Sequence, residues 1–266
     1  MSLLPLMHTV PLWLVGLVLT VLAEIYAVGL MLAARYTYGV SRLSLNNEVA
    51  GFKFAVIGVF YAVMLAFVVI AVWEDYRHTE AAVRDEAKAA VDLYRVTFAM
   101  PMDGGEDIRA HLTRYLEDVP KDEWRSMAVG EPSETVAQDL NQLSAAIFAV
   151  QPEGRRELAL YQRALTLLTV MTDARAERLD SASGSVPAIL WFVLSVGGMI
   201  TLGFPAFFAS SNVVAQVLMT ASLAALVALS LLLGFAFDFP FTGDPHISPQ
   251  PFLRALEQMP MHWPAP

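Results

Sequence analysis

The feature that most constrains the fold of this chain is a run of 20 residues without a charge, between Lys53 and Glu74. A bilayer hydrocarbon core of about 30 Å requires a helix of about 20 apolar residues, so this run has the length of a membrane span. Small residues recur in and just before it at intervals of three or four, which places them on one helix face where another backbone can approach closely. They are Gly51, Ala55, Gly58, Ala62 and Ala66. The segment predicts a membrane-spanning helix that packs against a specific neighbour.

The composition agrees with a membrane protein. Only 16% of the residues are charged, whereas soluble proteins have about 25%, and the mean hydropathy is +0.51. Between Glu74 and Asp180 lie 34 of the 43 charged residues, so nearly all of the net charge of −9 belongs to one polar block. This acidic block argues against a nucleic-acid partner. The absence of cysteine excludes disulfides and thiolate metal sites. Because the first ten residues lack Lys and Arg, we expect no removable signal peptide.

Further apolar runs complete a pattern of four spans. The predicted spans cover residues 11–34, 51–73, 187–208 and 213–237. The predicted fold class is therefore all-α integral membrane, with two transmembrane helices, a soluble helical-bundle insert and two more transmembrane helices. The domain boundaries that follow are residues 1–73 for spans one and two, 74–185 for the insert, 186–237 for spans three and four, and 238–266 for a C-terminal tail.

The insert has the composition of a small antiparallel helical bundle. Its segments are rich in the helix formers Ala, Glu, Lys and Arg, and no alternating β pattern occurs in it. We expect breaks at Pro101 and at Gly104–Gly105. The predicted helices cover residues 79–100, 108–119, 134–150 and 153–179, and the tail adds a short amphipathic helix at residues 250–259.

Positive charges favour an extracytoplasmic insert. Arg35, Arg42 and Lys53 lie in or beside the loop between the first two spans, and the positive-inside rule places that loop in the cytoplasm. Arginines that flank the insert, such as Arg77 and Arg175, favour the opposite orientation, but long domains count less in this rule. We therefore expect the loop inside the cell and the insert outside the cytoplasm.

Glu24 lies near the middle of the first span. A carboxylate at that depth costs about 2.5–3.5 kcal/mol on insertion scales, so it normally faces a bundle interior, a partner or water. One interpretation is an ion or proton site. The alternative is a structural glutamate that is protonated or hydrogen-bonded to another helix.

The polar entrance to the second span is formed by Asn46, Asn47 and Glu48. These residues are candidates for a pore mouth or a binding site. In the alternative interpretation, Asn47 caps the helix N-terminus and Glu48 stabilises the positive end of the helix dipole.

The two faces of the second span suggest different roles. Gly51, Ala55, Gly58 and Ala62 favour helix packing, because small residues permit helix contact more often than they line a channel. The other face carries Ile57 and three aromatic rings that could form a hydrophobic constriction in an oligomer. These rings belong to Phe54, Tyr61 and Phe67.

Two arginines near the end of the insert, Arg175 and Arg178, are candidates for contact with lipid phosphates or with anions. Pairing with acidic residues of the insert is the alternative. The histidines show no paired metal spacing, and there is neither a Gly-rich phosphate loop nor a Ser–His–Asp signature. We therefore predict no catalytic residue, no metal site and no cofactor, and we do not expect an enzyme.

Several separated motifs together resemble those of one family. They are Asn47–Glu48 with Gly51, Gly58 and Tyr61; Tyr115 with Glu123–Trp124; Arg175 with Arg178–Leu179; Pro187 with Trp191; and Pro240–Phe241 with Gly243. The chain resembles, from about residue 10 to 257, the uncharacterised bestrophin-like membrane family of bacteria and plants.

The resemblance implies a distant relation to bestrophins, which are oligomeric anion channels with four spans per subunit. It implies that span two lines the pore and that the protein is a multi-pass protein of the bacterial inner (plasma) membrane. The segment from Asp238 to Asp244 is similar in outline to the bestrophin calcium-clasp segment, but it lacks the dense acidic run, which puts a calcium site in doubt. Glu24 and the net charge favour cations, so anion selectivity is implied by analogy alone.

Two functional hypotheses follow. The first is a homo-oligomeric ion channel or small-ion transport protein, whose partners are the lipid bilayer, further copies of the chain and small ions. The second is a non-conducting membrane receptor or scaffold whose helical insert binds a partner or ligand.

Overall fold

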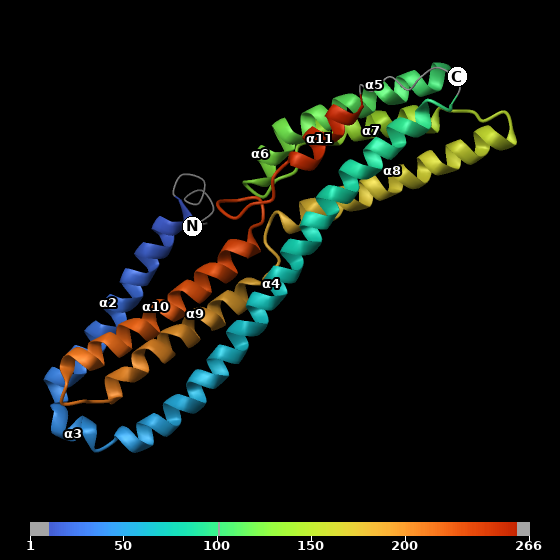
Figure 1. Ribbon diagram of the computed structural model, residues 1–266. Helices are drawn as coiled ribbons and strands as arrows, with labels where there is room; N and C mark the ends of the chain where they lie inside the picture. The colour runs from blue at the N-terminus through green and yellow to red at the C-terminus, as the bar shows by residue number, and fades with distance from the viewer. Residues whose placement is uncertain (1–10, 101, 260–266) are drawn as a thin grey trace. The chain divides into compact units, whose positions relative to one another are not determined.

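The computed structural model describes residues 11–100 and 102–259, and every regular element within these ranges is a helix (Figure 1). This confirms the predicted all-α class. The chain divides into two compact units. The first contains the residues up to Glu74 together with Ser185–Asp238, and the second contains Asp75–Gly184 together with the tail from Phe239 onward.

Four helices in the described ranges are long and apolar enough to cross a membrane. Each of them coincides with a predicted span. They are α2 (Leu12–Tyr38), α4 (Asn47–Thr97), α9 (Ala188–Gly203) continued by the 3-10 turn η2 (Phe204–Phe207), and α10 (Val213–Asp238).

Proline and glycine set several of the helix ends. Pro11 and Pro187 occupy the N-cap positions of α2 and α9. Gly39 has a φ of 76°, which an L side chain rarely adopts, and it separates α2 from the short helix α3 (Val40–Ser44). Pro205 has no N–H to donate to the helix, and at this proline α9 gives way to the 3-10 turn η2.

Helix α4 is a single helix of 51 residues. The helical segments predicted separately at residues 51–73 and 79–100 belong to this one helix, because the backbone continues between them without a break. Between Gly58 and Pro101 the chain contains neither glycine nor proline, so no residue interrupts the hydrogen bonding of the helix.

In the first unit, polar contacts fix the connections between the apolar helices. Arg35 donates hydrogen bonds to the carbonyl oxygen of Ser210 (2.6 Å) and to Oε1 of Gln216 (3.1 Å). The buried carboxylate of Asp238, at the end of α10, accepts hydrogen bonds at Oδ1 from the backbone N–H of Ser185 (2.9 Å) and at Oδ2 from Nε1 of Trp191 (2.9 Å). These bonds tie both ends of α10 to neighbouring segments of this unit.

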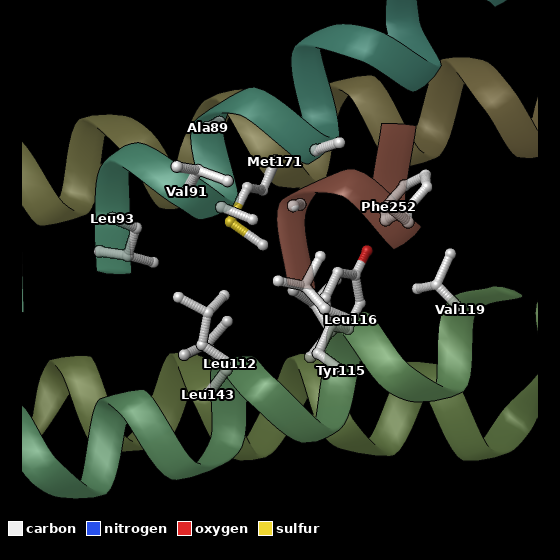
Figure 2. Close-up of a cluster of buried hydrophobic side chains, with 14 of the residues drawn as sticks. Ala89, Val91, Leu93, Leu112, Tyr115, Leu116, Val119, Leu143, Met171 and Phe252 are labelled. Atoms are coloured by element: carbon white, nitrogen blue, oxygen red, sulfur yellow. The ribbon is translucent and has the colours of Figure 1, made fainter. Parts of the chain in front are cut away.

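The second unit has its own hydrophobic core, shown in Figure 2. Side chains from the second part of α4 meet side chains from four other helices there, among them Leu93, Leu112, Leu143, Met171 and Phe252. The four helices are α5 (Met102–Asp118), α7 (Glu134–Phe148), α8 (Arg155–Ser181) and α11 (Gln250–Gln258). A π-helical turn, η1 (Val119–Glu123), leads into α6 (Trp124–Met127).

The predicted break at Gly104–Gly105 is wrong, because both glycines lie inside α5. A Cβ atom on Gly105 would lie 2.5 Å from the carbonyl oxygen of Thr97. The glycine is therefore used for close approach of two backbone segments rather than for ending a helix.

The tail packs on the second unit. Trp124 donates a hydrogen bond from Nε1 to the carbonyl oxygen of Ile247 (3.0 Å), and its ring lies edge-on to those of Phe241 and Phe252. The predicted amphipathic helix at residues 250–259 corresponds to α11.

Candidate functional site

One face of α4 in the first unit carries large apolar side chains that no part of the described chain covers. Their spacing of three or four residues places them along one stripe of the helix. Each is between 48% and 75% exposed, and all of them except Phe52 lie in the segment without charge from residue 54 to 73. We call this stripe the α4 ridge; it consists of Phe52, Val56, Val59, Phe60, Val63, Phe67 and Ile70.

The three aromatic rings predicted to share a face do not do so. Phe67 lies on the α4 ridge and is 70% exposed. Phe54 stacks on Phe204 at a centroid distance of 5.7 Å, and Tyr61 is buried. A Cβ atom on Gly198 of α9 would lie 2.9 Å from the Tyr61 hydroxyl oxygen. Phe54 and Tyr61 therefore pack the rear of α4 against η2 and α9, and only Phe67 keeps the position expected for a pore-lining ring.

The small residues of α4 border an apolar groove of about 570 Å³. The wall contributed by α4 includes Ala55, Gly58 and Ala62, and the wall contributed by α10 includes Leu226 and Leu233. A Cβ atom on Gly58 would have no heavy atom within 4 Å, so no helix of the described chain closes on this glycine. Close helix packing at these positions stays a prediction, because the helix that packs there would have to come from another molecule. A Cβ atom on Gly51 would lie 3.8 Å from the ring of Phe208, which is an ordinary contact distance.

At the polar entrance to α4, one of the three residues, Asn47, has a structural role. Nδ2 of Asn47 donates to the carbonyl oxygen of Ala209 (2.8 Å), and Oδ1 of Asn47 accepts from the N–H of Ala209 (3.1 Å). Asn47 is the first residue of α4, and Asn46 occupies the position before it, where its carbonyl accepts from the N–H of Ala50 (2.8 Å). The prediction that Asn47 caps the helix is therefore wrong. Asn46 and Glu48 are exposed, so their side chains are accessible at the start of α4.

Glu24 lies half-buried on α2 and makes no hydrogen bond or ion pair with residues 11–100 and 102–259. Its neighbour Tyr26 donates a hydrogen bond to the carbonyl oxygen of Met199 (3.2 Å), and Ala27 is buried. An ion site and a structural role for Glu24 therefore both stay predictions.

The second unit contains a buried charge cluster of five side chains, which joins α4, α5, η1 and α8. At its centre Arg178, with no exposed surface, donates to Glu86 (Nε to Oε2, 2.8 Å) and to Glu123 (Nη2 to Oε2, 2.6 Å). Arg175 donates to Glu123, and the hydroxyl of Tyr115 donates to Glu86. Two guanidinium groups thus balance two carboxylates inside the unit.

The cluster changes the proton affinity of its members. Burial alone would lower the pKa of Arg178, but the carboxylates of Glu86 and Glu123 raise it above its ordinary value, so the guanidinium stays charged. Burial, followed by the charge of Glu86, raises the pKa of Tyr115 well above its ordinary value. The guanidinium also lies over the ring of Trp124, 5.1 Å from its centroid.

The prediction that Arg175 and Arg178 contact lipid or an anion is wrong in this structure. Arg178 is fully buried and Arg175 is 12% exposed, and the carboxylates of the same unit occupy both. The alternative interpretation, pairing with acids of the insert, is correct. Sequence reasoning did not identify Glu86, although it shares a helix face with Val83 and Ala90, which are three and four residues away.

Comparisons with known proteins agree with this fold. The family model described as the bestrophin-like domain matches residues 15–252. A solved structure of a bacterial bestrophin homologue from Klebsiella pneumoniae has a TM-score of 0.68 and 13% identity, and the match covers 90% of this chain and 96% of that one. Two single-residue variants of that homologue have TM-scores of 0.69 and 0.70 at 13% and 12% identity, with 90% of this chain covered and 97% and 95% of theirs.

At these identities the likeness to solved structures shows the fold alone. Among curated proteins, no sequence matches this chain significantly. The family assignment rests on the domain match, which includes most of each apolar helix and the second unit up to the start of α11. The chain belongs to the bestrophin-like family.

Proposed function

We propose that this chain is the subunit of a homo-oligomeric ion channel in which α4 lines the ion pathway. Residues 1–73 and 186–237 would form two pairs of membrane spans, residues 74–185 an extracytoplasmic insert, and residues 238–266 a tail. The location would be the bacterial inner membrane, with lipid, further copies of the chain and small ions as partners. Membership of the bestrophin-like family supports this proposal, because bestrophins are anion channels. A channel needs neither a cofactor nor catalytic residues, and we propose none.

The α4 ridge carries the proposal. It presents seven large apolar side chains to the outside of the single subunit, while α9 and η2 support α4 from behind through Tyr61 and Phe54. A ring of such ridges around a symmetry axis would form a hydrophobic constriction of the kind that gates channels by dewetting. We place Phe60 and Phe67 at that constriction. Phe54 and Tyr61, which pack against η2 and α9, would set the position of α4.

The polar residues of α2 and α4 would act at the mouth of this pathway and along it. Asn46 and Glu48 are exposed at the start of α4 and would lie at its mouth. Asn47 would hold the mouth in shape through its bonds to Ala209. Glu24 would supply a carboxylate to the pathway or to a neighbouring copy, since no side chain of the described ranges pairs with it.

Ion flux through proteoliposomes tests the proposal. Vesicles that contain the purified protein should release a trapped salt, and Phe67→Ala should change the flux several-fold because it removes a ring from the constriction. Phe192→Ala is the matched control: Phe192 is 63% exposed on α9, away from the α4 ridge, and its loss should leave the flux unchanged.

Three results would contradict the channel. Vesicles that stay tight with well-folded protein would exclude conduction. Equal effects of Phe67→Ala and Phe192→Ala would show that the α4 ridge faces lipid. A strictly monomeric mass in detergent would exclude a pathway lined by several copies and would favour the second candidate, a receptor or scaffold. One observation supports that candidate: the second unit has a hydrophobic core and a buried charge cluster of its own.

A further inference from the structure

A groove in the second unit concentrates positive charge on an otherwise acidic chain. It lies between the second part of α4 and α11 and has a volume of about 300 Å³. Its lining residues recur at intervals of three or four on both helices, so each helix contributes one face. They are Arg84, Ala87, Lys88, Val91, Asp92 and Arg95 of α4, and Pro251, Arg254, Ala255 and Gln258 of α11.

Four of these side chains are cationic and one is acidic, on a chain whose net charge is −9. The one lining acid, Asp92, pairs with Arg95 (Oδ1 to Nη1, 3.3 Å), and Arg84 pairs with Glu80 outside the groove (3.2 Å). Lys88 and Arg254 form no ion pair with any described residue. The groove therefore keeps a positive excess after its own acids are counted.

The form of the groove suits an extended ligand rather than a compact one. Its short apolar side chains, from Ala87, Val91 and Ala255, leave space between the charged ones. From Arg84 to Arg95 the cations span 11 residues of one helix, which is about 16 Å at 1.5 Å per residue. A single phosphate cannot reach all of them. The planar guanidinium groups match the oxygen pairs of phosphates, and Lys88 adds a mobile point charge.

We propose that this groove binds an anion that carries two or more phosphate groups, either a soluble polyphosphate compound or the headgroup of a doubly phosphorylated lipid. The binding does not depend on ion conduction, so it can be present or absent whether or not the protein is a channel. The site is distinct from the buried charge cluster, whose arginines are occupied by Glu86 and Glu123.

Calorimetric titration of the detergent-solubilised full chain tests this binding with three probes: inorganic phosphate, tripolyphosphate and cardiolipin. We expect tripolyphosphate, cardiolipin or both to bind at least tenfold more tightly than inorganic phosphate, because only they can reach several cations. The double variant Lys88→Gln/Arg254→Gln should weaken that binding at least tenfold, and Lys88→Arg should retain it. The control Arg155→Gln/Arg156→Gln removes the same charge from exposed positions on α8, outside the groove, and should leave the affinity unchanged.

Each possible result of these titrations either supports the proposed site or overturns it. Groove-dependent binding of tripolyphosphate identifies a soluble ligand, and groove-dependent binding of cardiolipin alone identifies a lipid headgroup; both support the site. Absence of binding of either probe would overturn the proposal. So would binding that the two double variants weaken equally, because that is attraction to overall charge, or binding no tighter than that of inorganic phosphate. All the substituted side chains are exposed, and an unchanged melting temperature without ligand shows that each variant is folded.

Discussion

At the residue scale, Arg178 is the member of the buried charge cluster that pairs with both carboxylates, those of Glu86 and Glu123. Arg178→Met would leave Glu86 and Glu123 with Arg175 as their one remaining guanidinium in the cluster. Breaking a buried pair by removing one partner typically costs about 3–5 kcal/mol. We expect a loss of that order in the free energy of unfolding, measured by denaturant unfolding in detergent.

Arg163→Ala is the control for this prediction. Arg163 is exposed on the same helix, α8, and surface substitutions usually change stability by less than about 0.5 kcal/mol. If both variants were equally stable, the cluster would not be a source of stability.

A second effect at the residue scale concerns Asp139 on α7, whose ionisation makes the stability of the fold depend on pH. Its Oδ2 is buried and has no hydrogen-bond partner among the described residues. Burial, followed by the nearby carboxylate of Asp118, raises the pKa of Asp139, while Arg114 and His111 act in the opposite direction. Ionised Asp139 is therefore disfavoured in the fold, and stability that is present at low pH is lost as the pH rises from the unfolded-state pKa through the raised folded-state pKa.

The variant Asp139→Asn tests this effect, because it removes the charge and keeps the shape. We expect it to raise the melting temperature at pH 7 relative to the unmodified chain and to lose that advantage near pH 4. A difference that is the same at both pH values would show that ionisation of Asp139 does not limit stability.

At the scale of elements, α5 illustrates a conflict between helix propensity and packing. Alanine favours a helix interior over glycine by about 1 kcal/mol. A Cβ atom at Gly105 would nevertheless lie 2.5 Å from the carbonyl oxygen of Thr97, and backbone cannot yield as a side chain can. Overpacking of this kind costs about 1–3 kcal/mol. We therefore expect Gly105→Ala to lower the melting temperature. Gly29→Ala, on α2 with no heavy atom within 4 Å of the new Cβ, should not lower it.

The continuity of α4 is also a property at this scale. Its first part borders the apolar groove and carries the α4 ridge, whereas its second part supplies the buried Glu86 and one wall of the cationic groove. One helix thus contributes residues to both units.

At the scale of the whole molecule, the open groove beside Gly58 predicts where copies of the chain meet. Gly58→Leu would place a branched side chain where a neighbouring helix should pack, so the oligomer should dissociate to smaller species in light scattering or native mass spectrometry. Gly29→Leu is the control, because Gly29 is equally open on α2 and does not line the groove. An oligomer that survives Gly58→Leu would place the interface elsewhere.

Much of the fold can be predicted from hydropathy and from helix-breaking residues. Residues 213–237 match α10 to within one residue because the polar Asn212 and the charged Asp238 bound a largely apolar run. The orientation of individual side chains cannot be predicted in this way. Phe54, Tyr61 and Phe67 look equivalent in sequence, yet α9 and η2 cover two of them and leave the third exposed.

The sequence by itself determined the number of apolar helices, the all-α class and the family. The reason is that bilayer thickness sets the length of a span, and a helix satisfies its backbone hydrogen bonds within one segment. The tertiary structure alone decided the partners of the charged groups. Arg178 and Glu86 are 92 residues apart, and both attraction to lipid and pairing with an acid were compatible with their positions in the chain. The packing of α8 against α4, with Met127 and Trp124 beside the guanidinium, removed water from the pair, and that burial made the carboxylate its partner.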